Sequence, residues 1–203
     1  MATGTERTKA LTPPITVKEW GEVDGSPRYD LVDGRLREKP PVAYWHEILL
    51  VSLSSFVLTY VKARGLGHVV ISNAKLKISE TGGREPDLFF VPIDQYHLVG
   101  KNLFKGVPPL VAEVLSPSKE REDRVTKFRE YALLGIGEYW IIDFANRRIE
   151  IYRLQPQPDG SNGYALAEAV EGETAIFRPS FFPGLEIPLA EVWPTEFEHR
   201  TDD

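Results

Sequence analysis

The sequence predicts a single α/β or α+β domain in which helices cover at least one face of a mixed β-sheet. Three observations carry this prediction: an Asp-Gly hairpin signal near the N-terminus, a long amphipathic helix over residues 43–64, and several strand-like runs around a second helix. A chain of 203 residues is long enough to bury a sizeable core in one domain. We expect a disordered tail over residues 1–12 and one domain over residues 13–197.

The N-terminal part of the domain is predicted to form a short helix and then a hairpin. Thr16 can cap a helix, and Glu19 stands at the spacing of a capping box. Asp33-Gly34 separates two runs in which apolar and polar residues alternate. Such a dipeptide is the strongest short-range hairpin signal, so residues 29–38 are expected to form two antiparallel strands.

The remainder of the chain is predicted to alternate helices with short strands. Apolar residues recur at helical spacing over residues 43–64, and Gly65 follows as a natural stop. Ser116-Pro117 favours the start of a second helix, which is expected to end at Gly135. Strands are expected at residues 68–72, 74–78, 87–91, 110–115, 139–143, 149–154 and 164–170, with a loop over residues 155–163 and short strands with a final helical turn in the tail.

The composition is that of a water-soluble protein rather than a membrane or disulfide-stabilised one. The chain has no run of eighteen apolar residues and no basic-then-apolar N-terminus, so neither a membrane span nor a signal peptide is expected. It contains no cysteine, which excludes disulfides and thiolate metal sites and fits a cytoplasmic location. The net charge of −6 argues against a broad nucleic-acid-binding face.

Two acidic residues lie in or beside strand-like apolar runs. Asp87 precedes Leu-Phe-Phe-Val, and Glu113 lies within Leu-Val-Ala-Glu-Val-Leu. A buried carboxylate is costly unless it is paired or binds a metal. One or two carboxylates suffice for Mg²⁺, which lowers the pKa of a bound water and neutralises charge on a phosphate. An exposed strand-entry residue at Asp87 and a structural ion pair at Glu113 remain open as alternatives.

Further candidates lie on the helices and at the end of the hairpin. Asp123, Lys127 and Tyr131 recur four residues apart and share one helix face, from which Lys127 could orient or activate an attacking water. A surface pair between Asp123 and Lys127 is the alternative. Glu38 is a candidate for a further metal oxygen, and His46 for contact with a phosphate or a metal-bound water. Both also fit plain roles, as a solvated strand end and a polar helix start.

The order of these motifs carries a resemblance to a known family. The matching stretches are YDLVDG at 29–34, His46, EPD at 85–87, VAEVLSPS at 111–118, Asp123, Lys127, Tyr131 and GIGEYWIID at 135–143. With these the sequence resembles the Uma-two family of restriction endonucleases (domain of unknown function 820), within the PD-(D/E)XK nuclease superfamily, over about residues 16–195. The resemblance implies a restriction-endonuclease-like mixed β-sheet core flanked by helices, with an N-terminal β-hairpin and extra C-terminal strands.

The resemblance also implies an activity, that of a Mg²⁺-dependent endonuclease (Mn²⁺ possible) acting on DNA. Asp87 and Glu113 would hold the metal together with the backbone carbonyl of Val114. Where the superfamily has a lysine two residues after the acidic residue, this chain has Leu115, so Lys127 is expected to supply the missing function. The expected supporting residues are Glu38, His46, Asp123 and Tyr131.

Two other functions and an assembly state follow from the same residues. Leu115 and the acidic net charge favour a catalytically inactive nuclease-fold protein that binds nucleic acid or a protein partner. A metal phosphohydrolase acting on nucleotides would need a closed pocket in place of an open groove. A homodimer is expected for a nuclease, because two strands need two sites.

Overall fold

The computed structural model describes residues 14–116 and 120–194. A six-stranded mixed sheet forms the centre of this part of the chain. Strands β8 and β9 pair in parallel, and the other neighbouring strands of the sheet pair antiparallel. In order across the sheet the strands are β11 (Asn162–Glu171), β10 (Arg148–Pro156), β9 (Glu138–Asp143), β8 (Leu110–Val114), β6 (Leu88–Pro92) and β3 (Gly67–Ile71).

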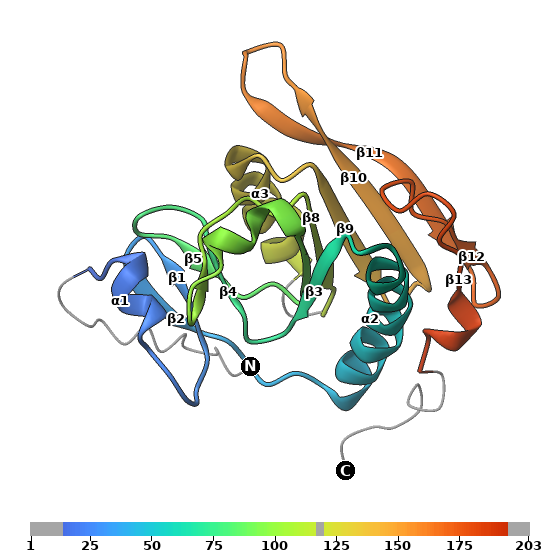
Figure 1. The fold of residues 1–203 in the computed structure, drawn as a ribbon, viewed down its shortest axis with the longest axis horizontal. Helices are drawn as coiled ribbons and strands as arrows, with labels where there is room; N and C mark the ends of the chain where they lie inside the picture. Colours follow the sequence, from blue (N-terminus) through green and yellow to red (C-terminus); the bar gives the residue numbers. More distant parts are fainter. Residues whose placement is uncertain (1–13, 117–119, 195–203) are drawn as a thin grey trace, which may run out of the picture.

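The predicted hairpin belongs to a second, five-stranded sheet. Asp33 and Gly34 have positive φ angles of 49° and 72°, as a tight two-residue hairpin turn requires. Figure 1 shows this sheet beside the short helix α1 (Val17–Gly21), while the β10–β11 hairpin extends beyond the body of the domain. The strands of the five-stranded sheet are, in order, β2 (Arg35–Glu38), β1 (Tyr29–Val32), β5 (Gly83–Arg84), β4 (Lys75–Lys77) and β7 (Leu103–Phe104). A separate two-stranded sheet is formed by β12 (Ile176–Phe177) and β13 (Ile187–Pro188).

Local sequence signals account for the ends of the helices. The first helix begins after Thr16, whose side chain forms the predicted capping box with Glu19. The long helix ends at Gly65 and the later helix at Gly135, both in the left-handed conformation that glycine adopts without strain. The helices are α1 (Val17–Gly21), α2 (Tyr44–Arg64), the 3₁₀ turns η1 (Ile93–Leu98) and η3 (Leu189–Glu191), the π-helical η2 (Glu122–Lys127) and α3 (Phe128–Leu134).

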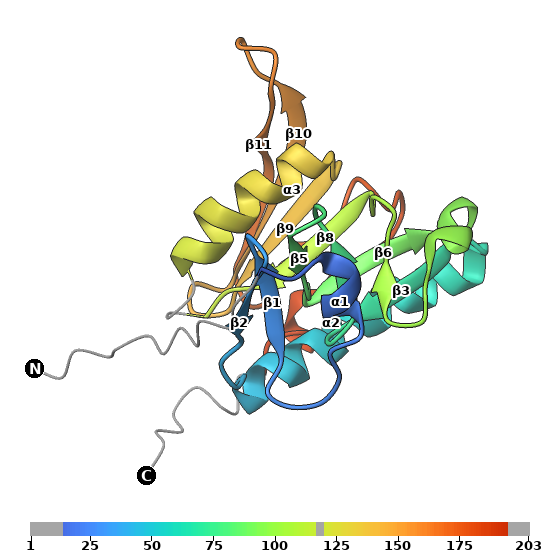
Figure 2. The same cartoon turned by 90° about the vertical axis from the view of Figure 1, so that its left-hand side faces the viewer.

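The central strands are buried on both faces. In β6, Leu88 and Phe90 pack against α2 and the C-terminal segment, whereas Phe89 and Val91 pack on the side of α3. Alternating side chains of one strand thus enter two separate cores, and the strand reads as a continuous apolar run. Figure 2 shows α2 and α3 on opposite sides of this sheet.

The long helix is a core element even though its composition would suit a lipid bilayer. By length and mean hydropathy (1.2) α2 could cross a membrane, and 44% of its apolar stretch is buried inside the protein. Leu49, Leu53 and Val57 on its inner face are fully buried against the sheet. Packing within the domain therefore accounts for the apolar residues of this inner face.

Most predicted elements are confirmed, and two are corrected. Residues 122–127 are π-helical where the sequence predicts an α-helix. The loop predicted over residues 155–163 is shorter, because β10 continues to Pro156 and β11 begins at Asn162. Backbone pairing across the hairpin extends both strands beyond their apolar cores. The predicted tail over residues 1–12, and Pro117 in the predicted helix start, lie outside the described residues.

Candidate functional site

Most of the predicted site residues line one pocket of about 90 Å³. The pocket lies among the start of α2, the beginning of β6, the end of β8 and the π-helical η2. These elements are far apart in the sequence and meet where the inner strands β6 and β8 begin and end. The predicted residues that line the pocket are His46, Asp87, Glu113, Val114, Asp123 and Lys127.

Asp87 connects three of these elements. Its Oδ2 accepts a hydrogen bond from the Val114 backbone N–H at 2.8 Å and lies 3.1 Å from His46 Nε2. Burial opposes ionisation of Asp87, but the hydrogen bond and charge of His46, the charge of Lys127 and the Val114 N–H outweigh it and lower the pKa of the carboxyl. Asp87 is therefore a carboxylate with one oxygen held in place, and its side chain retains 16% exposure toward the pocket.

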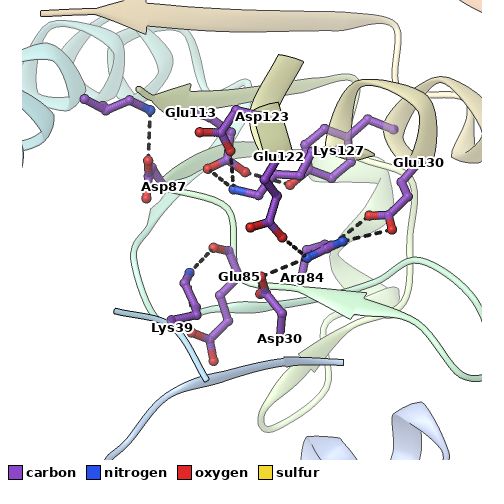
Figure 3. Close-up of polar contacts among 12 residues, drawn as sticks. Asp30, Lys39, Arg84, Glu85, Asp87, Glu113, Glu122, Asp123, Lys127 and Glu130 are labelled. Atoms are coloured by element: carbon purple, nitrogen blue, oxygen red, sulfur yellow. Dashed lines mark hydrogen bonds and ion pairs between the residues drawn. The ribbon is translucent and has the colours of Figure 1, made fainter. Parts of the chain in front are cut away.

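Glu113 and Lys127 form the buried centre of the site. Figure 3 shows Lys127 between the carboxylates of Glu113 and Asp123, with its Nζ 2.8 Å from Glu113 Oε2 and 2.8 Å from Asp123 Oδ1. The Tyr131 hydroxyl donates to Glu113 Oε1 at 2.7 Å. Burial, together with the charges of Asp87 and Asp123, raises the pKa of Glu113, although Lys127 counteracts it. Burial works against the Lys127 charge, but Glu113 and Asp123 raise its pKa well above the usual value. Lys127 is therefore a protonated ammonium group.

The helix that carries Lys127 departs from α geometry where the site needs it. Asp123 and Lys127 both lie in η2, whose wider π-helical turn passes into α3 at Phe128. Single π-helical stretches within α-helices occur frequently at functional sites. Here the wider turn accompanies a geometry in which Lys127 contacts Asp123 while Tyr131, one turn later, reaches Glu113.

A second buried charge cluster anchors the same helix to the other sheet. Arg84, only 1% exposed, pairs through Nη1 with Asp30 Oδ2 at 3.0 Å and with Glu122 Oε1 at 2.8 Å. Its Nε and Nη2 donate to the two oxygens of Glu130 at 2.7 and 2.9 Å. Burial opposes the charge of Arg84, but Glu130 and Asp30 raise its pKa. Arg84 ends β5 and lies three residues before Asp87, so this cluster ties the chain just before Asp87 to the helix that carries Lys127.

One predicted site residue lies elsewhere, and one role remains a prediction. Glu38 is exposed at the end of β2 and does not line the pocket, so the structure does not support it as a metal ligand. The strand ends one residue before Lys39, whose Nζ instead lies 2.6 Å from the Glu85 backbone oxygen and lines the pocket. Val114 lines the pocket and contacts Asp87 through its N–H, while a metal-binding role of its carbonyl stays a prediction.

Sequence reasoning missed Arg84 and most of the outer pocket wall. Arg84 immediately precedes the Glu-Pro-Asp motif, but a single basic residue there gives no indication of three distant acidic partners. Arg28 and Trp45 also line the pocket without any motif of their own. The proximity of Trp45 to His46 in the sequence is the only signal that could have drawn attention to it.

The chemistry of the lining suits a hard divalent cation with few protein ligands. Carboxylate and backbone oxygens together with waters are the ligands that Mg²⁺ prefers. Among residues 14–116 and 120–194, no group of three or more His, Asp or Glu side chains is arranged to hold a metal ion. Both contacts that hold the Asp87 carboxylate, from His46 and from the Val114 N–H, are made to Oδ2, and the side chain keeps 16% exposure. The donor chemistry of Asp87 and Glu113 is of the kind that a metal retaining several waters requires, although both Glu113 oxygens already contact Tyr131 and Lys127.

Comparisons with known proteins agree with this fold. One solved structure, described as a putative nuclease belonging to DUF820 from Anabaena variabilis ATCC 29413, aligns with a TM-score of 0.69 at 18% identity, covering 89% of this chain and 98% of that one. This likeness shows the shared fold. No curated protein gives a significant match. A family model described as "Putative restriction endonuclease" matches residues 18–190, which is most of the sequence. The chain therefore belongs to this family, Uma2, with a restriction-endonuclease-like fold.

Proposed function

We propose that this protein is a divalent-metal-dependent endonuclease that hydrolyses phosphodiester bonds in DNA. Mg²⁺ is the proposed ion, with Mn²⁺ as a substitute, because both take oxygen ligands. The observation that carries the proposal is the contact of Lys127 Nζ with Glu113 Oε2 at 2.8 Å, in a pocket that Asp87 also lines. The chain lacks the motif lysine at Leu115, and the helix supplies an ammonium group at the same carboxylate.

Each residue has a distinct proposed role. Asp87 and Glu113 would hold the metal, which when bound supplies an acidified water and charge neutralisation at the phosphate. Lys127 is protonated, so it acts as a hydrogen-bond donor that orients the attacking water and stabilises negative charge on the phosphate, rather than as a base. His46 fixes the orientation of Asp87, and Tyr131 that of Glu113.

Metal titration calorimetry tests the proposal. Wild-type protein is expected to bind Mg²⁺ or Mn²⁺ saturably and to cleave DNA only when one of them is present. Asp87→Ala and Glu113→Ala are expected to lose both properties. Glu38→Gln is the matched control, because it removes an exposed carboxylate outside the pocket and is expected to change neither. Metal binding that is indifferent to Asp87 and Glu113 would overturn the proposal.

The second candidate function is that of a nuclease-fold protein that binds nucleic acid or a protein partner without cleaving it. Both oxygens of Glu113 already have partners, Tyr131 and Lys127, and this observation favours it. One experiment distinguishes the two functions. An inactive binding module would retain oligonucleotides and leave them intact in Mg²⁺ and Mn²⁺ alike.

The assembly and location of the enzyme are part of the same proposal. Cleavage of both strands of a duplex needs two sites, which a homodimer supplies by symmetry. A chain without cysteines suits the reducing conditions of the cytoplasm. Sedimentation at micromolar protein, with and without DNA, would distinguish a dimer from a monomer.

A further inference from the structure

Part of the pocket wall has no role in the chemistry proposed above. It comes from the segment between β2 and α2 and from the first turn of α2, which contribute Pro40, Pro41, Val42 and Trp45. Val42 is 40% exposed, and Tyr44, at the first position of α2, is 84% exposed. An apolar and aromatic segment of this kind, left open to solvent beside buried charged groups, requires an explanation.

One of the two aromatic side chains in this segment, Trp45, is held in place. The Trp45 ring stacks on Phe144, with ring centroids 4.6 Å apart and an interplanar angle of 16°, and its edge meets His46. His46 in turn contacts Asp87, so the Trp45 ring has a fixed position relative to this carboxylate. Tyr44, the residue before it, is open to solvent and free to adjust to a flat ligand.

The reactive groups lie at a depth that restricts the ligand. The side chains of Glu113 and Lys127 are 2% and 5% exposed, and only Asp87 has appreciable exposure at 16%. The pocket is small, about 90 Å³, so a nucleic acid can place only a small group such as a phosphate beside them. The bases of an intact duplex are stacked on one another inside it, whereas a single strand can unstack its bases onto aromatic side chains.

Basic side chains at the pocket suit the backbone of such a strand. Arg28 is half-buried, donates to the Asn73 side chain and lines the pocket together with Lys39. Among the described lining residues, four are basic, counting His46, and four are acidic. A bound divalent cation would therefore make the lining net positive, even though the whole chain carries a charge of −6.

We propose that the pocket takes a single-stranded or locally unpaired segment of nucleic acid, with bases stacked on Tyr44 and Trp45 and a flanking phosphate at Arg28. The net positive charge of the lining and the identity of the cleaved bond rest on the function proposed above, whereas the stacking contacts do not. Stacking on aromatic side chains is tolerant of sequence, because every base has a π-face. The ligand class is thus selected by strand flexibility rather than by base identity.

Binding of fluorescein-labelled oligonucleotides, followed by anisotropy, tests this proposal. A single strand of about 16 nucleotides, near the upper site size of one binding module, is compared with the same sequence as a duplex. Ca²⁺ replaces Mg²⁺, and a gel verifies that the oligonucleotides stay intact. The single strand is expected to bind at least about tenfold more tightly than the duplex, because it avoids the cost of unpairing.

Two variants and two matched controls locate the contacts. Tyr44→Ala is expected to weaken single-strand binding by about 5- to 150-fold, the loss that accompanies one stacked base. Arg28→Gln is expected to reduce the slope of log affinity against log salt by about 0.7, the value of one phosphate contact on a single strand. Leu133→Ala, which removes an exposed apolar side chain from α3, and Lys62→Gln, at the far end of α2, are expected to change neither quantity.

The outcomes separate this proposal from the proposed reaction. Duplex binding as tight as single-strand binding, or a Tyr44→Ala variant that binds normally, overturns the strand preference and leaves the nuclease reaction in place. A single-strand preference that depends on Tyr44, without cleavage in Mg²⁺ or Mn²⁺, supports the preference and rejects the reaction.

Discussion

Two buried charge clusters share the η2–α3 helix and differ in what their charges can reach. In the first, Arg84 faces Asp30, Glu122 and Glu130, and none of the four lines the pocket. In the second, Lys127 pairs with two carboxylates at the pocket, and Asp87, which also lines the pocket, is partly exposed. Unusual burial of charge therefore does not identify a functional site by itself. Access to a cavity distinguishes the second cluster from the first.

The largest effect is expected when the cation of the first cluster is removed. Arg84→Met leaves three acidic side chains around an apolar group, which is expected to lower the free energy of unfolding by about 3–5 kcal/mol. Urea denaturation measures this loss. Arg178→Met is the control, because Arg178 pairs with Glu186 at the surface and is expected to contribute about 0–1 kcal/mol. Equal losses in the two variants would contradict a structural role for the Arg84 cluster.

The pocket cluster is expected to show the opposite balance between stability and activity. Glu113→Gln keeps an acceptor for the Tyr131 hydroxyl and leaves Asp123 to pair with Lys127, so the free energy of unfolding should change by less than about 1.5 kcal/mol. DNA cleavage should fall at least about 100-fold, because a metal-binding carboxylate is lost. Denaturation and cleavage assays on one preparation measure both. A destabilised variant that still cleaves would reverse the assignment of the two clusters.

The proposed role of Lys127 can be tested by placing a lysine at position 115, where the superfamily motif has one. Glu113 and Leu115 are two residues apart on β8 and its extension, and Leu115 packs in the same core as Tyr131. Lys127→Met is expected to lower the cleavage rate by about 10²- to 10⁴-fold. Adding Leu115→Lys to Lys127→Met should raise the cleavage rate again by at least about tenfold, whereas adding Leu115→Met should leave it unchanged. Recovery with both second changes would exclude a specific role of the ammonium group.

The smallest expected effect is a pH dependence of the Arg84 cluster. Burial raises the pKa of Asp30, but Lys39 and then Arg84 outweigh it and hold the pKa below the usual value. Asp30 therefore contributes stability above its unfolded-state pKa, and the contribution is lost as the pH falls through the lower folded-state pKa. Asp30→Asn should reduce stability by about 1.5 kcal/mol at neutral pH. The difference from wild type should shrink in acid, and a difference that is constant with pH would contradict the assignment.

The fold was largely predictable because its signals are local. The capping box at Thr16, the hairpin turn at Asp33-Gly34 and the stop at Gly65 each act within a few residues. The candidate site was predictable in part, since Asp87 and Glu113 are anomalous in their own apolar runs. A carboxylate within such a run is visible in the sequence without knowledge of its partner.

What could not be predicted depends on pairs of residues that are distant in the sequence. The partners of Arg84 lie 54, 38 and 46 positions away, at Asp30, Glu122 and Glu130. No spacing rule connects positions that meet only after the two sheets pack. The position of Glu38 outside the pocket could not be predicted for a related reason, because the residue alternation of a two-stranded hairpin does not tell which end of it faces the pocket.

The π-helical stretch places a constraint on the directions of the side chains along this helix. A π-helix holds more residues per turn than an α-helix, so residues 122–127 store extra backbone between Asp123 and Tyr131. In a continuous α-helix the eight residues from Asp123 to Tyr131 would advance by about 800°, which leaves the two side chains about 80° apart around the axis. The wider π-helical turn advances less per residue and therefore brings both side chains toward the Glu113–Lys127 pair. A change that converts this stretch to α-helix at constant length would turn Asp123 away from the face that carries Tyr131.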